Sequence, residues 1–164
     1  MSYSLGELEA LCLKAARGAG FSWGLAEDAG RAVRWLEARN LGGATALAGL
    51  LEATDKIPRD DMCPIFFGAS LADRPPAQPF SRPAILAPVL LTPFLAGIAT
   101  SQTDGLTLWI TPTDETASSP THTRAKLSPQ LYARLNRFAE RTYAPATEAS
   151  RLAGAGTGGL TDND

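Results

Sequence analysis

The chain has 164 residues, of which 45% are hydrophobic and 20% are charged, with 15 basic and 17 acidic side chains. This composition is typical of a globular domain, and it argues against disorder over most of the length. The net charge of −2 leaves no excess of basic groups for a phosphate backbone, so we expect no binding to nucleic acid. We expect residues 1–164 to form a single domain.

The start of the chain and its cysteines predict the cellular compartment of the protein. The opening MSYSLGELEA has neither a positively charged region nor an apolar run, so we expect no signal peptide. Cys12 and Cys63 are too few for a disulfide framework, and we expect reduced thiols in the cytoplasm. Cys12 falls at an apolar helical position, where a small buried side chain is expected.

The first third of the chain is predicted to be helical. Ser4 and Glu7 have the spacing of a capping box, and the helix that they begin should end at the glycines of RGAG, residues 17–20. Ser22 is predicted to cap a second helix that stops near Asn40, and a third runs from about residue 44 to 53. Helices joined by such short loops usually pack as antiparallel neighbours.

The middle of the chain is less regular. CPIFFGASL (63–71) fits a strand or a helix, so the structure of residues 60–82 stays open, and DRPPAQPFSRP (73–83) is predicted to be an extended connector. The apolar runs 84–91 and 94–101 are predicted to be strands, with their prolines at edges or bulges. Asp104-Gly105 predicts a hairpin that returns through LTLWIT (106–111).

The same region raises the question of a membrane span. Residues 83–103 carry no charge, and their length would allow a crossing. Prolines recur there every five residues, however, and a single helix broken in this way is expensive in lipid. We therefore expect a buried sheet core and no membrane association.

The last part of the chain is predicted to be a loop followed by a helix. TPTDETASSPTHT (111–123) should be an exposed loop, and Ser128-Pro129 should start a helix with apolar side chains at 131, 135 and 138. Arginines 134, 137 and 141 fall on or near its other face. Together these elements predict an α+β fold, with an N-terminal helical cluster, a small mostly antiparallel sheet and a C-terminal helix packed across it.

The Gly- and Asp-rich end SRLAGAGTGGLTDND (150–164) contains the spacing G-x-G-x-x-G. A dinucleotide fingerprint needs a strand before these glycines and a helix after them, and only five residues follow Gly159, so the match is weak. Two other interpretations stay open. The end is a flexible tail, or Arg151 and the amides around Gly154 and Gly156 form a nest for a carboxylate or phosphate.

ARGAGFSWG (16–24) is a second candidate for anion binding. Arg17 precedes a helix start and Arg31 follows it, while Trp23 could cover the apolar part of a ligand. Alternatively, Phe21 and Trp23 only pack the two helices together. The candidate ligand-binding residues for an anionic metabolite are therefore Arg17, Trp23, Arg31, Arg151, Gly154 and Gly156.

No catalytic set emerges from the sequence. His122 is the only histidine, and its Thr-rich surroundings predict an exposed imidazole, while Asp60 and Asp61 beside Cys63 would make this thiol a poorer nucleophile. No nucleophile, base and orienting group come together. We expect no metal site and no cofactor, and the catalytic residues are unknown.

LGELEALCLKAARGAGFSWGLAEDAGRAVRWLE (5–37) and PATEASRLAGAGTGGLTDND (145–164) resemble a family of small bacterial proteins catalogued as a domain of unknown function. The resemblance implies no reaction, but it implies that the Gly/Asp-rich end belongs to the domain, which favours a docked end over a flexible tail. Two functions are then expected: a binding or accessory module with a protein partner or a second copy of itself, or a small enzyme or sensor for an anionic metabolite.

Overall fold

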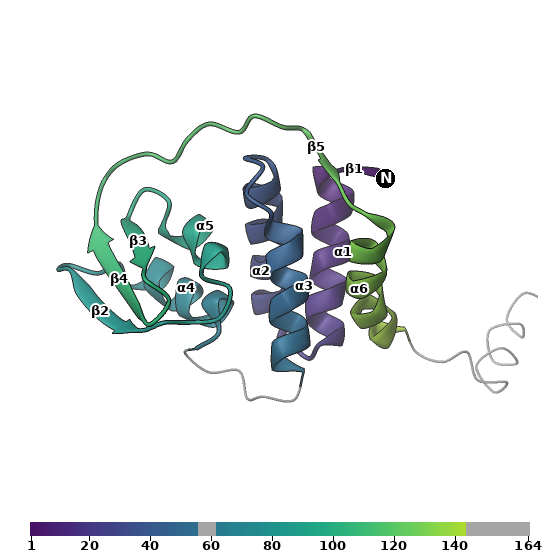
Figure 1. Ribbon diagram of the computed structural model, residues 1–164, viewed down its shortest axis with the longest axis horizontal. Helices are drawn as coiled ribbons and strands as arrows, with labels where there is room; N and C mark the ends of the chain where they lie inside the picture. The colour runs from purple at the N-terminus through teal and green to yellow at the C-terminus, as the bar shows by residue number, and fades with distance from the viewer. Residues whose placement is uncertain (56–61, 144–164) are drawn as a thin grey trace, which may run out of the picture.

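The computed structural model describes residues 1–55 and 62–143, and Figure 1 shows their arrangement. The elements in chain order are β1 (Ser2–Ser4), α1 (Leu5–Gly18), α2 (Trp23–Glu37), α3 (Gly43–Thr54), α4 (Pro64–Asp73), β2 (Phe80–Pro83), the 3-10 helix η1 (Pro88–Leu91), α5 (Thr92–Leu95), β3 (Ala99–Thr103), β4 (Thr107–Pro112), β5 (Arg124–Lys126), α6 (Pro129–Ala139) and the 3-10 helix η2 (Glu140–Thr142).

Helices α1, α2, α3 and α6 stand side by side and form the larger part of the molecule (Figure 1). Serines begin three of them, as the sequence predicts. The Ser4 hydroxyl accepts the Glu7 N–H at 3.2 Å while Glu7 Oε2 accepts the Ser4 N–H at 2.7 Å, and the hydroxyls of Ser22 and Ser128 cap α2 and α6. The apolar faces of these helices share one core, which includes Phe21, Leu36 and Phe138.

Close contact between α1 and α6 depends on a glycine. A Cβ atom at Gly18 would lie 1.7 Å from the carbonyl oxygen of Phe138, far inside any allowed contact. The absence of a side chain at position 18 therefore lets the end of α1 touch the backbone of α6 directly.

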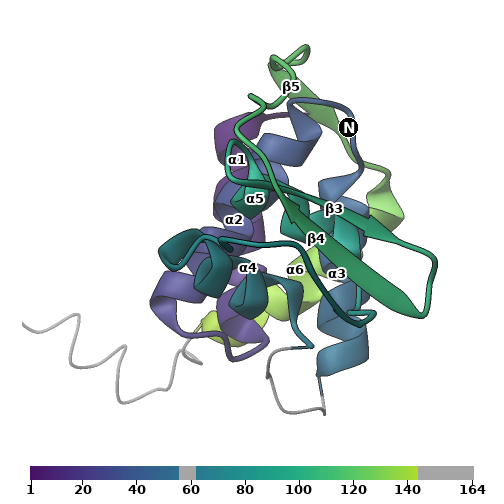
Figure 2. The ribbon, with the colours of Figure 1, turned by 90° about the vertical axis from the view of Figure 1, so that its left-hand side faces the viewer.

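The three-stranded sheet has the order β2-β4-β3, and both of its pairings are antiparallel. Figure 2 views the molecule from the side that carries this sheet, and the sheet lies in front of the helices there. Leu108 and Ile110 of the central strand point inward, and they form a second core with the buried side chains Leu71, Ile85, Leu91, Leu95 and Ala99. The hairpin at Asp104 is confirmed, because its Oδ1 accepts the N–H groups of Thr107 at 2.8 Å and Leu106 at 2.9 Å. These bonds lower the pKa of Asp104.

The two cores meet at η1. Leu90 and Leu91 are neighbours in the chain, and both side chains are fully buried. Leu90 belongs to the core of the helical cluster, whereas Leu91 belongs to the core beneath the sheet. This single turn therefore joins the packing of the two parts.

Residues 113–123, which we call the strap, run from β4 to β5 over the top of the molecule in Figure 1. The N–H groups of Thr121 and His122 both donate to the carbonyl oxygen of Ala38, at 2.7 and 2.9 Å. Strand β5 then pairs with β1 in a second, two-stranded sheet. The strap is thus fastened to the end of α2 just before β5 begins.

The α+β class is confirmed, and so are the four predicted long helices, three of which begin at the predicted serine caps. The interpretation of 84–91 as a strand is wrong, because Pro88 begins η1, where a missing N–H costs nothing. Residues 94–101 are strand only from Ala99. The proline-rich connector contains β2, and 63–71 are helical.

The predicted place of the last helix also needs correction. Helix α6 packs on α1 and α3 rather than across the three-stranded sheet, because its buried side chains, Leu135 and Phe138, belong to the core of the helical cluster. In the uncharged stretch 83–103, η1, α5 and β3 replace any long helix. Over residues 1–55 and 62–143, no helix has the length and apolar character needed to cross a membrane.

Candidate functional site

The loop between α1 and α2 is held together by its own side chains. The Arg17 guanidinium donates from Nη1 to the carbonyl oxygen of Phe21 and lies 4.6 Å from the centre of the Trp23 ring. Phe21 is buried between the helices, as the packing interpretation predicts, whereas Trp23 is 64% exposed. Arg17 and Trp23 are thus brought together at this end of α2.

Arg31 does not join that pair. It lies eight residues beyond Trp23 on α2, which corresponds to about 12 Å along a helix axis. Its guanidinium contacts Asp28 at 2.7 Å and Glu27 at 3.9 Å, both on its own helix. Arg151, Gly154 and Gly156 lie outside the described residues, as does the predicted docking of the Gly/Asp-rich end.

A groove of about 830 Å³ lies at the other end of α2. Three segments that are distant in the sequence form it: the start of α1, one face of α2 and the end of the strap. The lining residues are Ser4, Leu5, Gly6, Glu9, Arg31, Arg34, Trp35, Ala38, Arg39, Pro120, Thr121, His122 and Thr123. Its volume is within the range of small-molecule sites, roughly 300–1,000 Å³.

The α2 wall of the groove follows from helical spacing. Its five residues lie at intervals of three and four along residues 31–39, so they share one face of the helix. Residues 120–123 of the strap form another wall, and two N–H groups of the strap bond to the carbonyl oxygen of Ala38, as described above. At the start of α1, Leu5 and Gly6 occupy the first two helical positions, whose N–H groups have no acceptor inside a helix.

Trp35 and Arg39 contact each other in the groove. The Arg39 guanidinium lies 3.7 Å from the centre of the Trp35 ring, a cation–π stack between side chains four residues apart. Its Nη1 donates to the carbonyl oxygen of Trp35 at 3.1 Å, and its Nε donates to the carbonyl oxygen of Ser118 at 2.8 Å. The strap and the end of α2 together therefore fix this guanidinium.

The three arginines of the groove differ in whether a carboxylate pairs with their charge. Arg34 donates to Glu9 at 2.8 Å, and Arg31 is paired with Asp28. In the part of the chain that the structure describes, no carboxylate pairs with Arg39, whose guanidinium donates to two carbonyl oxygens. Arg39 therefore keeps both a full charge and further N–H donors for another partner.

Side chains that could act as nucleophiles or metal ligands either lie outside the groove or are isolated from one another. Cys12 is fully buried, and this burial raises the pKa of its thiol, while Cys63 is buried at the start of α4. His122 is exposed, as predicted, and it lines the groove. Within residues 1–55 and 62–143, no three His, Cys, Asp or Glu side chains lie close enough to hold a metal ion.

The sequence analysis named Arg31, which lines the groove, as a candidate for a different site, and it did not name Trp35 or Arg39. The available signal was their spacing, since an aromatic residue and an arginine four positions apart near a helix end fall on one face. The contribution of the strap was not predicted, because residues 118–123 reach α2 mostly through backbone groups, with one further bond from the Thr121 hydroxyl to the carbonyl oxygen of Ala38 at 3.5 Å.

The comparisons concern the N-terminal part of the chain. Residues 3–74 match the model of a family described as "Protein of unknown function (DUF3726)". The match covers less than half of the chain, and it confirms the resemblance of residues 5–37 to a family of unknown function; the quoted C-terminal stretch lies outside it. No curated protein and no solved structure matches the chain.

The matched range includes two of the three walls of the groove, the start of α1 and the face of α2. The strap lies outside this range.

Proposed function

We propose that the protein is a cytoplasmic binding module that holds a small organic ligand in the groove between α1, α2 and the strap. The groove itself carries this proposal, since it combines an apolar surface with a few polar groups from three segments. Burial of both cysteines agrees with a role in binding rather than in thiol chemistry. Two free thiols also agree with a reducing compartment.

The three tryptophans give a direct test, because each reports on a different region. Trp23 lies beside Arg17, Trp35 lines the groove and Trp109 lies on β4. Protein labelled with fluorotryptophan should therefore show three fluorine NMR signals. On titration with naphthoate and its neutral amide, naphthamide, we expect the Trp35 signal to move with at least one of the two compounds while the other signals stay in place.

Two glycine variants locate the binding. Gly6 and Gly24 are each the second residue of a helix, and a Cβ atom at either position would meet no other atom within 4 Å. Only Gly6 lines the groove. Gly6→Phe should abolish the response of Trp35, and Gly24→Phe should leave it unchanged. If neither compound moves the Trp35 signal, or if both variants behave alike, the proposed groove function is wrong.

A protein partner, or a second copy of the chain, is the second candidate. Large apolar side chains are exposed on the part of the molecule that holds the three-stranded sheet: Leu106 is 83% exposed and Trp109 is 40% exposed. Such exposed groups often mark interaction surfaces. Light scattering over a range of concentrations should then show association that Leu106→Glu weakens, whereas a strict monomer with an unperturbed Trp109 signal would contradict this candidate.

A further inference from the structure

We propose that the ligand of the groove is an organic anion, a carboxylate or similar acidic group attached to a flat apolar ring system. The inference deepens the proposed function and depends on it. In this assignment Arg39 pairs with the acidic group, and Trp35 contacts the ring system.

The charge distribution of the groove favours an anion. Its lining includes three arginines and a single carboxylate, Glu9, which Arg34 already engages. Arg31 is engaged by Asp28, so the charge of Arg39 is the one that a ligand can still neutralise. A guanidinium matches the two oxygens of a carboxylate, and such charge-assisted bonds are stronger than neutral ones.

The position of Arg39 is preorganised for this role. Stacking on Trp35 and two bonds to carbonyl oxygens hold the guanidinium before any ligand arrives. A ligand would therefore not bear the cost of ordering a long side chain. Leu5 and Gly6, the first two residues at the positive end of α1, line the same groove, and this end of the helix adds to the attraction for negative charge.

The apolar part of the ligand follows from Trp35. This side chain lines the groove together with Leu5 and Ala38, so the surface offered beside the charge is apolar and partly aromatic. An inorganic anion would leave that surface in contact with water. An acid with a flat ring system covers it and gains from both contacts.

The test compares an acid with the amide of the same shape. We expect naphthoate to bind about tenfold to a hundredfold more tightly than naphthamide, as judged from the Trp35 fluorine signal, because only the acid makes charge-assisted hydrogen bonds. Acetate and inorganic phosphate serve as anions without a ring, and they should bind much more weakly than naphthoate.

Arginine variants identify the paired group. Arg39→Gln should remove the preference for the acid, and Arg39→Lys, which keeps the charge, should retain part of it. Arg17→Gln is the matched control, because Arg17 also stacks on a tryptophan and bonds to a carbonyl oxygen, but it lies at the far end of α2. Each variant should first show the melting temperature and far-UV spectrum of the folded protein.

The outcomes separate this inference from the proposed function. Equal binding of acid and amide at Trp35 would overturn the assignment of an anion and leave the groove as a ligand site. A ligand response at Trp23 that Arg17→Gln removes would move the anion to the loop between α1 and α2. Equal losses in Arg39→Gln and Arg39→Lys would mean that Arg39 only holds the strap, and no response of Trp35 to either compound would overturn both proposals.

Discussion

Single atoms decide the packing of α1 on α6. At Gly18 the carbonyl oxygen of Phe138 occupies the space that a β-carbon would need, and this oxygen belongs to backbone that cannot rotate away. A clash with a flexible side chain can relax, whereas a clash with helical backbone requires the whole element to shift. The contact therefore fixes both the residue at position 18 and the spacing of the two helices.

Gly18→Ala should lower the free energy of unfolding by about 3 kcal/mol, the upper part of the range for overpacked sites, or prevent folding altogether. The natural comparison is Gly49→Ala in the interior of α3, where the new methyl group meets nothing within 4 Å. That variant should be more stable than the parent by about 0.5 kcal/mol, because alanine restricts the unfolded chain. Urea unfolding measures both values, and similar effects of the two substitutions would contradict the described contact.

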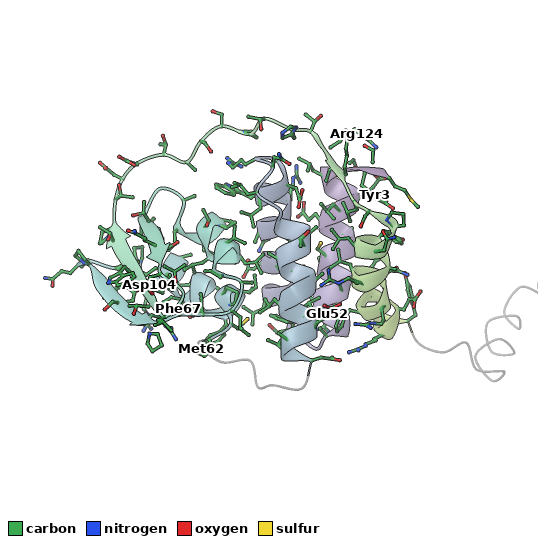
Figure 3. The ribbon with its side chains drawn as sticks, viewed as in Figure 1. Tyr3, Glu52, Met62, Phe67, Asp104 and Arg124 are labelled. Atoms are coloured by element: carbon green, nitrogen blue, oxygen red, sulfur yellow. The ribbon has the colours of Figure 1, made fainter. Side chains whose placement is uncertain are left out.

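At the scale of the element, α6 is clamped to α3 by charge as well as by apolar packing. Glu52 of α3 lies beside α6 (Figure 3), and it accepts two hydrogen bonds from Arg134, at 2.7 and 2.9 Å. Arg141 forms a similar pair with Asp55 one turn further along. The bonds from Arg134 lower the pKa of Glu52 below its usual value, so the carboxylate form is favoured in the folded protein.

The clamp makes stability depend on pH in a defined direction. Because folding lowers the pKa of Glu52, its contribution is complete above the unfolded pKa, near 4.5, and is lost as the pH falls through the lower folded value. Glu52→Gln should therefore cost about 0.5–1 kcal/mol at neutral pH and almost nothing near pH 3. Denaturant unfolding at both pH values tests this, with Glu140→Gln as the control, because Glu140 has no basic partner among residues 1–55 and 62–143. If Glu52→Gln lowers the free energy of unfolding equally at both pH values, the Glu52–Arg134 pair contributes through packing and not through charge.

Helices and turns that are marked by capping or turn residues could be predicted from the sequence, and elements without such residues could not. Ser4, Ser22 and Ser128 each begin a helix, and Asp104-Gly105 turns a hairpin, because caps and turns depend on neighbours within three residues. The run 84–91 has no such signal: its apolar residues fit a strand as well as a helix, and packing into two cores decides the result.

The groove was beyond prediction for a related reason. Helical spacing places Trp35 and Arg39 together, but nothing in the sequence indicates that residues 118–123 reach them. That contact spans 79 residues between Arg39 and Ser118, and it uses a backbone oxygen that every residue carries. A site assembled from distant segments through backbone groups leaves no pattern in the chain.

At the scale of the whole molecule, η1 couples the two cores. Leu90 packs with the helices and Leu91 packs beneath the sheet, so neither part can lose its core without exposing a leucine from the same turn. Coupling of this kind favours a single cooperative transition. The helical cluster and the sheet should therefore behave as one unit in equilibrium experiments.

We expect the fluorine signals of native Trp35 and native Trp109 to disappear at the same urea concentration, because one signal reports on the helices and the other on the sheet. Leu90→Ala should lower the stability of the whole protein by about 2–4 kcal/mol, the usual cost of emptying a buried leucine site, and shift both signals equally. Two separate midpoints in the parent protein would mean that the sheet and the helices unfold independently.

The pairing of the first strand with the fifth has a consequence for synthesis. Met1 and Leu127 exchange two hydrogen bonds, and α1 packs against α6, so β1 and α1 have partners that are synthesised much later. On the ribosome, which releases the chain from its N-terminus, α2 can cover one side of α1 early, but the side that packs against α6 stays uncovered until α6 has emerged. A nascent chain halted before residue 124 would expose this side to other chains, and we expect chaperones to bind it there.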